Sequence, residues 1–195
     1  MASPVAELLA AFGSVADRLG VPWYLFGAQA ALLYGAARLT ADVDVTVDLG
    51  THPTHALVDG LSIAGFELRV RDVDQFVERT RVIPLVHVST GLPLDVVLAG
   101  PGPEALFLAR VQHRDVEGIS VPVASPEDLV VMKVLAGRSK DLEDVRAILT
   151  AHRSDLDLGH LRETLHALES ALDQSDLSPL LEQLLSATSD VKERD

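Results

Sequence analysis

The chain of 195 residues contains no cysteine, which excludes disulfides, thiolate zinc sites and a cysteine nucleophile. Only 4% of the residues are aromatic although 48% are hydrophobic, so the core must be built from Leu, Val and Ala. No apolar run reaches membrane-spanning length. The chain begins with an amphipathic helical pattern, MASPVAELLAAFGSVADRLG, which lacks the basic start of a signal peptide. We therefore expect a soluble, cytoplasmic globular protein.

A broad basic surface is also missing, because the formal net charge is −13. This charge argues against wholesale binding of nucleic acid, although a local site is not excluded. Six arginines lie in the middle of the chain: Arg69, Arg71, Arg79, Arg81, Arg110 and Arg114. They could together form a modest basic rim, but we favour the interpretation that they are ordinary solvated side chains. The sequence also lacks a P-loop and a serine nucleophile elbow, and its histidines show no metal-ligand spacing.

Hydrophobic periodicity predicts an α+β fold with a mixed β-sheet. Strands are expected at 21–26, 42–48, 66–70, 82–88, 92–99 and 119–124. Helices are expected at 4–19, 28–37, 52–65, 103–109, 126–136, 139–152, 157–174 and 178–188. Hairpin signals between strands make a purely parallel sheet unexpected. We predict a core flanked by helices over residues 1–124 and a helical region over 125–195 packed on it, with the last residues frayed.

The run DVDVTV places valines on one face of a strand and acids on the other. Asp42 and Asp44 share that second face, where like charges repel unless a cation or water compensates them. A strand whose polar face meets water accounts for the pair. Asp95, however, lies inside the apolar strand LPLDVVLA, where an unpaired carboxylate is costly to bury. Acids on two core strands suit a hard divalent cation, which takes carboxylates, water and substrate phosphates.

Lys133 stands among apolar residues in the helix LVVMKVLA. Its amine either reaches the surface along the side chain's apolar stem or points toward a phosphate or an aspartate. In the next helix Asp141 and Asp144 share a face, and Lys140 with Asp144 has the spacing of an ordinary helix ion pair.

Three segments together carry a family resemblance: FGAQAALLYGAARLTADVDVTVD, PLDVV and ASPEDLVVMKVLAGRSKDLEDV. The chain resembles the minimal nucleotidyltransferases of the DNA polymerase beta superfamily, most closely the branch of abortive-infection toxins of type IV toxin–antitoxin systems. The pattern of that branch is a strand ending in Gly-Gly or Gly-Ser, an Arg-x-Thr-x-Asp-x-Asp strand, a later acid and a charged helical block. The resemblance implies a nucleotidyltransferase core followed by helices.

The resemblance also implies roles for individual residues. Asp42, Asp44 and Asp95 would hold Mg²⁺ or Mn²⁺, with Asp95 activating the incoming hydroxyl. Lys133 and Asp141 would form the branch's C-terminal functional pair, with Arg138 and Asp144 beside them. The nucleotide phosphates would be bound by the backbone amides from Gly27 onward at a helix start and by neighbouring residues: Gly27, Ala28, Arg38, Thr40 and Arg138.

The implied reaction transfers a nucleoside monophosphate from an NTP such as ATP to a hydroxyl of an RNA end, a protein or a small molecule. A toxin-like role would add an antitoxin protein as partner. Ala28 departs from the pattern, because it has no hydroxyl where the family has Gly or Ser. Ala28 therefore favours, as one alternative, an inactive module of the same fold that binds a nucleotide or a protein. A second alternative is an aminoglycoside-type enzyme, because enzymes of that kind share the Gly…Asp-x-Asp architecture.

Overall fold

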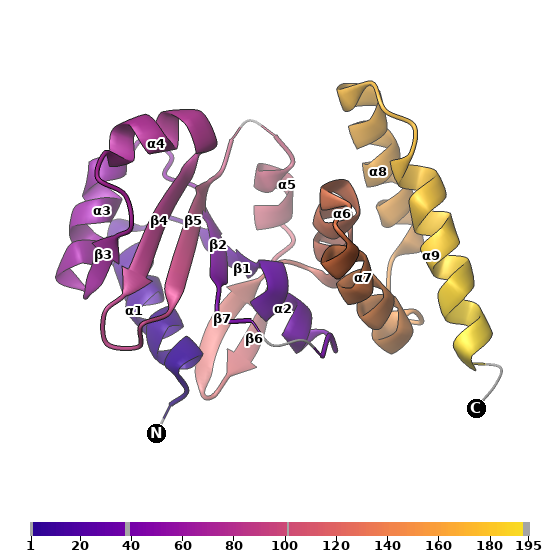
Figure 1. The fold of residues 1–195 in the computed structure, drawn as a ribbon, viewed down its shortest axis with the longest axis horizontal. Coiled ribbons are helices and arrows are strands. Elements are labelled where there is room, and N and C mark those ends of the chain that lie inside the picture. The colour runs from indigo at the N-terminus through magenta and orange to yellow at the C-terminus, as the bar shows by residue number, and fades with distance from the viewer. Residues whose placement is uncertain (1, 38–39, 101, 193–195) are drawn as a thin grey trace. The chain divides into compact units, whose positions relative to one another are not determined.

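The structure, a computed structural model, describes residues 2–37, 40–100 and 102–192 (Figure 1). The chain divides into two compact units. The first comprises Met1–Gln29 with Leu39–Ala124, and the second comprises Ala30–Arg38 with Ser125–Asp195. In the described part of the chain, no helix has both the length and the apolar surface to cross a bilayer.

The first unit is built on a seven-stranded sheet of order β3-β4-β5-β2-β1-β7-β6. The strands are β1 (Trp23–Phe26), β2 (Val43–Val47), β3 (Phe66–Leu68), β4 (Val82–His87), β5 (Pro93–Leu98), β6 (Gln112–Val116) and β7 (Ile119–Val123). The neighbours β2 and β5, and β1 and β7, run parallel, whereas the other pairs are antiparallel. The predicted mixed sheet is therefore confirmed.

The two faces of this sheet differ in character. Trp23 of β1 packs edge-on against Phe12 of helix α1 (Pro4–Leu19), with ring centroids 5.0 Å apart. Because Trp23 is paired with Val47 in the register of β1 and β2, the three valines of β2 face the same side and are fully buried. Asp44, which alternates with them, consequently lies on the face of the sheet away from α1.

Four further helices or helix starts belong to the first unit: the beginning of α2 (Gly27–Leu33), α3 (Thr54–Ile63), α4 (Val73–Thr80) and α5 (Glu104–Leu108). Helix α1 packs against α3 and β7, and α4 packs against β4. The N-cap of α1 is Ser3, whose hydroxyl accepts a hydrogen bond from the Ala6 amide, and Pro4 takes the first helical position as predicted.

The second unit contains the helices α6 (Pro126–Ala136), α7 (Ser139–His152), α8 (Leu158–Leu172) and α9 (Leu177–Lys192). Helix α6 packs against α7 and α8, and α9 packs against all three. Ser125 caps α6 by accepting a hydrogen bond of 3.1 Å from the Asp128 amide, and Gly137 ends it with φ +64°, as the sequence predicts. The segment after α2 joins this unit, where Tyr34 packs edge-on against His152 of α7 with ring centroids 5.8 Å apart.

Three local predictions were wrong or incomplete. Helix α4 and strand β6 were not expected. The apolar residues Val73, Phe76 and Val77 of α4 do recur at helical spacing, but the helix is only 8 residues long and buries none of them fully. Strand β6 is a mostly exposed edge strand and lacks the apolar alternation of a core strand. The helix expected over 28–37 ends at Leu33, because the chain turns at Gly35 with φ +97°. A positive φ of this kind is readily adopted by glycine and interrupts a helix.

Candidate active site

Asp44 and Asp95 stand side by side on neighbouring strands. Strands β2 and β5 are parallel, and Asp44 and Asp95 are direct partners in their register. Directly opposite residues of two paired strands project to the same face of a sheet. The two acids that the sequence places in separate segments are therefore brought together on the face away from α1.

Asp42 completes the acidic group from the loop before β2, where it is exposed. Burial raises the pKa of Asp95, and the negative charge of Asp42 raises it further, whereas the charge and hydrogen bond of Arg69 lower it. The net effect on the pKa of Asp95 is upward. Asp42 is thus close enough to Asp95 for its charge to be felt there.

Gly27 begins α2 directly beneath the carboxylate of Asp44. Phe26 and Asp44 are partners in the antiparallel register of β1 and β2, so the following turn passes the Asp44 side chain. A β-carbon built on Gly27 would overlap the Asp44 carboxylate, and Gly27 has φ +71°. Only glycine meets both demands at this position. The methyl group of the next residue, Ala28, is buried.

The loop that leads to Asp42 is held by side-chain hydrogen bonds. The amide of Gln29, a buried residue of α2, donates to the carbonyl oxygen of Thr40 at 3.1 Å. The Thr40 hydroxyl in turn accepts a hydrogen bond from the Asp42 amide at 3.3 Å. Thr40 therefore orders the acidic loop. Arg38, which the resemblance assigns to the phosphates, lies outside the described residues.

The donor set fits a hard cation that shares its coordination with a substrate. In the described ranges, no group of three or more His, Cys, Asp or Glu side chains is arranged to hold a metal ion by itself. Asp44 and Asp95 nevertheless offer adjacent carboxylate oxygens, and Mg²⁺ is commonly held by one or two carboxylates together with water and phosphate oxygens. Metal binding at the three predicted acids accordingly stays a prediction, in which the substrate supplies the remaining ligands.

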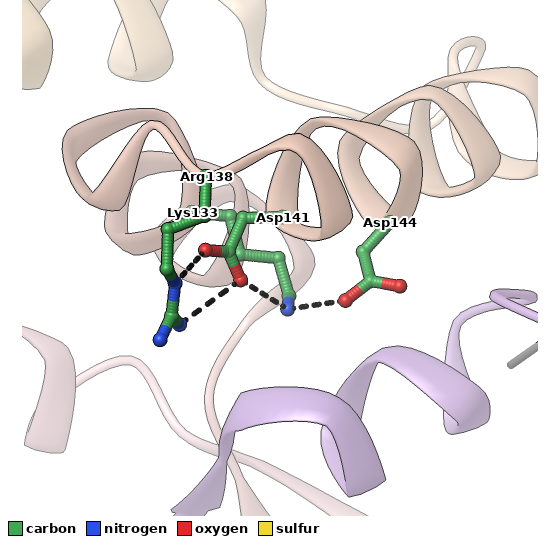
Figure 2. A network of polar contacts seen from close by, with 4 residues as sticks. All are labelled: Lys133, Arg138, Asp141 and Asp144. Atoms are coloured by element: carbon green, nitrogen blue, oxygen red, sulfur yellow. Dashed lines mark hydrogen bonds and ion pairs between the residues drawn. The ribbon is translucent and has the colours of Figure 1, made fainter. Parts of the chain in front are cut away.

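The predicted residues of the second unit form one ionic network (Figure 2). Lys133 of α6 places its Nζ atom 2.6 Å from Asp144 Oδ2 and 3.6 Å from Asp141 Oδ1. Arg138 donates two hydrogen bonds to the carboxylate of Asp141: its Nε lies 2.5 Å from Oδ2, and one terminal nitrogen lies 3.2 Å from Oδ1. Lys133 is only 4% exposed, and the two aspartates are each 2% exposed.

Two simpler accounts of these residues were wrong. The Lys133 amine does not reach the surface, and Asp144 pairs with this buried lysine, whereas Lys140 is exposed. Burial by itself would raise the pKa of Asp141, but hydrogen bonds and charges from Arg138 and Lys133 outweigh it and lower the pKa. The network therefore consists of three buried charges, those of Lys133, Asp141 and Asp144, which the exposed guanidinium of Arg138 completes from the solvent side.

The predicted site residues thus fall into two groups, one in each unit. The group in the first unit consists of the three acids Asp42, Asp44 and Asp95 with Gly27, Ala28 and Thr40. The group in the second unit consists of Lys133, Arg138, Asp141 and Asp144. Two residues of the first group were not singled out as site residues from the sequence. Gln29 gave no signal in an Ala-rich helix, and Arg69 was counted among solvated arginines although it pairs with Asp95.

Comparison with solved structures identifies similar folds. The solution structure of the antibiotic-resistance factor ANT(2″)-Ia matches with a TM-score of 0.59 and 16% identity, over 85% of this chain and 93% of that one. A crystal structure of ANT(2″)-Ia in complex with adenylyl-2″-tobramycin matches with a TM-score of 0.56 and 17% identity, over 85% and 97%. The lincosamide antibiotic adenylyltransferase LnuA, with lincomycin bound, matches with a TM-score of 0.52 and 15% identity, over 73% and 94%.

At these identities the likeness concerns the fold, and it confirms the predicted fold class. No curated protein matches the chain. The model of one protein family, described as "Nucleotidyltransferase of unknown function (DUF6036)", matches residues 5–194.

Proposed function

This chain belongs to the nucleotidyltransferase family DUF6036, and from that premise we propose that it transfers a nucleoside monophosphate from an NTP to an acceptor hydroxyl. The observation that carries the proposal is the pairing of Asp44 with Asp95 on parallel strands, above a glycine that leaves room for the Asp44 carboxylate. In the reaction, the acceptor oxygen forms a bond to the α-phosphorus. The bond from that phosphorus to the bridging oxygen breaks, and pyrophosphate leaves.

The acids have two tasks in this scheme. Asp42, Asp44 and Asp95 would hold Mg²⁺ or Mn²⁺, which when bound neutralises phosphate charge and polarises phosphoryl oxygens. Asp95 also accepts the proton of the acceptor hydroxyl and later gives it to water. Its place on the strand next to Asp44 supports this role, because the acceptor must approach the phosphate that Asp44 helps to position.

The triphosphate lies, in this proposal, along the turn that follows β1. Backbone amides from Gly27 and Ala28 donate to phosphate oxygens, so the missing hydroxyl at Ala28 removes one donor and leaves the amide. Thr40 supports the site by holding the Asp42 loop, and Arg38 supplies positive charge to the phosphates. In the second unit, the roles implied by the resemblance stay a prediction. The functional pair there is Lys133 with Asp141, and Arg138 lies beside it.

For the acceptor, we favour a small cationic molecule. The net charge of −13 attracts polycations and repels RNA, which would need a basic surface. Proteins that share the fold include one solved with adenylyl-2″-tobramycin and one solved with lincomycin. Transfer to an RNA end or to a protein, with an antitoxin as partner, is the alternative that the toxin-branch resemblance supports.

The test is transfer of label from α-³²P-labelled NTPs in the presence of Mg²⁺, with a panel of aminoglycosides, lincosamides and transfer RNA as acceptors. Wild-type protein should label one acceptor, and Asp44→Asn should lose at least about a hundredfold of the rate, as expected when a phosphoryl-transfer site loses a charge-stabilising group. Asp48→Asn is the matched control, because this residue directly follows the same strand and its side chain accepts from the Gly50 amide, as asparagine also can. Equal labelling by wild type and Asp44→Asn would refute the mechanism.

A further inference from the structure

Arg69 lies in one row with the acids across the sheet. Its backbone amide donates to the carbonyl of Pro84 at 2.9 Å, just beyond the end of β3. Pro84 is the register partner of Asp95, and Asp95 is the partner of Asp44. Residues in register on successive strands project to the same face, so the Arg69 side chain starts on the face that carries the carboxylates.

The guanidinium reaches across β4 to the candidate site. Arg69 Nε donates to the Leu85 carbonyl at 2.9 Å, and one terminal nitrogen donates to Oδ1 of Asp95. The side chains of Arg69 and Asp95 are 39% and 40% exposed, so the ion pair is open to solvent and to ligands. An exposed ion pair of this kind is weak enough to be exchanged for a stronger partner.

We infer that Arg69 competes with the divalent cation for Asp95, so that the site binds the cation well only when the nucleotide arrives with it. The inference rests on the proposed function. Before binding, the guanidinium holds Asp95 Oδ1 and repels an incoming cation. The phosphates of the NTP then offer Arg69 an alternative anionic partner, which guanidinium groups bind through paired hydrogen bonds. Arg69 is thus a positioning residue that couples metal entry to nucleotide entry.

The test measures Mn²⁺ binding directly, through the electron paramagnetic resonance signal of the free ion, with and without the α,β-methylene analogue of ATP. Without nucleotide, Arg69→Gln should bind Mn²⁺ about tenfold more tightly than wild type, since it lacks a positive charge within a few ångströms of the cation. Arg69→Lys retains the charge and should stay near the wild-type affinity. Addition of the analogue should strengthen Mn²⁺ binding less in Arg69→Gln than in wild type.

Arg71→Gln is the matched control, because it removes the same charge from an exposed arginine two residues along the chain. The inference is overturned if Arg69→Gln binds Mn²⁺ no more tightly than wild type, or if Arg71→Gln gains as much. Asp44→Asn separates this result from the proposed function. If Asp44→Asn leaves Mn²⁺ binding intact, the metal lies elsewhere and both proposals fail, whereas loss of binding with no effect of Arg69→Gln overturns the coupling alone.

Discussion

Lys133 is a positive charge that the fold buries between two negative ones. Transfer of an ammonium group from water into the protein interior costs several kcal/mol unless partners compensate it. Asp144 and Asp141 provide this compensation from the neighbouring helix, and Arg138 balances the second acid. The network therefore ties α6 to α7 through charge as well as through apolar packing.

Removal of the lysine should leave both aspartates buried with less compensation. We predict that Lys133→Met lowers the free energy of unfolding by about 3 kcal/mol or more, as is typical when one partner of a buried ion pair is lost. Urea denaturation measures the change. Lys140→Met, an exposed lysine at the start of α7, should change stability by less than about 0.5 kcal/mol. A comparable loss in both variants would contradict the structural role of the network.

Asp141 should make stability depend on pH at the acidic end. Its pKa in the folded protein lies below the ordinary value of 3.8, so its ionised form stabilises the fold above that value. This contribution is lost as the pH falls through the folded pKa. The difference in unfolding free energy between wild type and Asp141→Asn should therefore shrink from about pH 5 downward. Glu143→Gln, on the exposed side of the same helix, is the control.

At this scale the sequence predicted the acids better than their partners. Asp44 was singled out because it shares the polar face of a strand with a second acid, and Asp95 because a carboxylate inside an apolar strand is unusual; their roles in catalysis stay a prediction. Arg69 was missed because an arginine in a short half-exposed strand, here the one expected over 66–70, resembles any solvated arginine. Only the register of three strands reveals that it faces Asp95. Long-range pairing of this kind leaves no local pattern in the sequence.

The start of α2 depends on a glycine for two separable reasons. At φ +71° a β-carbon is strained, and at Gly27 it would also overlap the Asp44 carboxylate. We predict that Gly27→Ala lowers stability by about 1 kcal/mol or more and reduces nucleotidyl transfer to the level of Asp44→Asn. Thermal unfolding and the labelling assay measure the two effects.

Gly20 offers a matched comparison for this prediction. It has φ +66° at the end of α1, but no atom lies within 4 Å of a β-carbon built there. Gly20→Ala should therefore lose only the stability that backbone strain costs, less than Gly27→Ala loses, while it keeps its transfer activity. If both variants lose activity equally, the effect comes from backbone strain, and the contact between Gly27 and Asp44 is not the cause.

Among the elements, those with a buried face were predicted and those without one were not. Helix α1 was predicted with the bounds that the structure shows, because its apolar stripe and its Ser-Pro start are both strong signals. Helix α4 and strand β6 escaped prediction because their side chains mostly face solvent. Both elements depend on local interactions: Asp72 caps α4, and the turn at Glu117 and Gly118 joins β6 to β7. In short polar segments such as these, neither interaction produces a clear sequence pattern.

For the whole molecule, the sequence predicted the α+β class, the mixed sheet and a nucleotidyltransferase, and the fold neighbours and the family match confirm these. The toxin branch, the antitoxin partner and packing of residues 125–195 on the core remain predictions. That residues after Gln29 join the helical unit was not foreseen, because the contact of Tyr34 with His152 spans more than a hundred positions of the chain.

The direct pairing of Asp44 with Asp95 means that the spacing of these acids is encoded in strand alignment and not in loop conformation. The turn through Ser89, Thr90 and Gly91 can therefore vary in length during evolution without moving either acid, provided that β5 keeps its alignment with β2. A shift of β5 by a single residue would instead present Leu94 or Val96 to Asp44 and turn Asp95 to the opposite side. Divergent relatives should accordingly tolerate insertions in the turns that connect the strands far more readily than within β2 or β5.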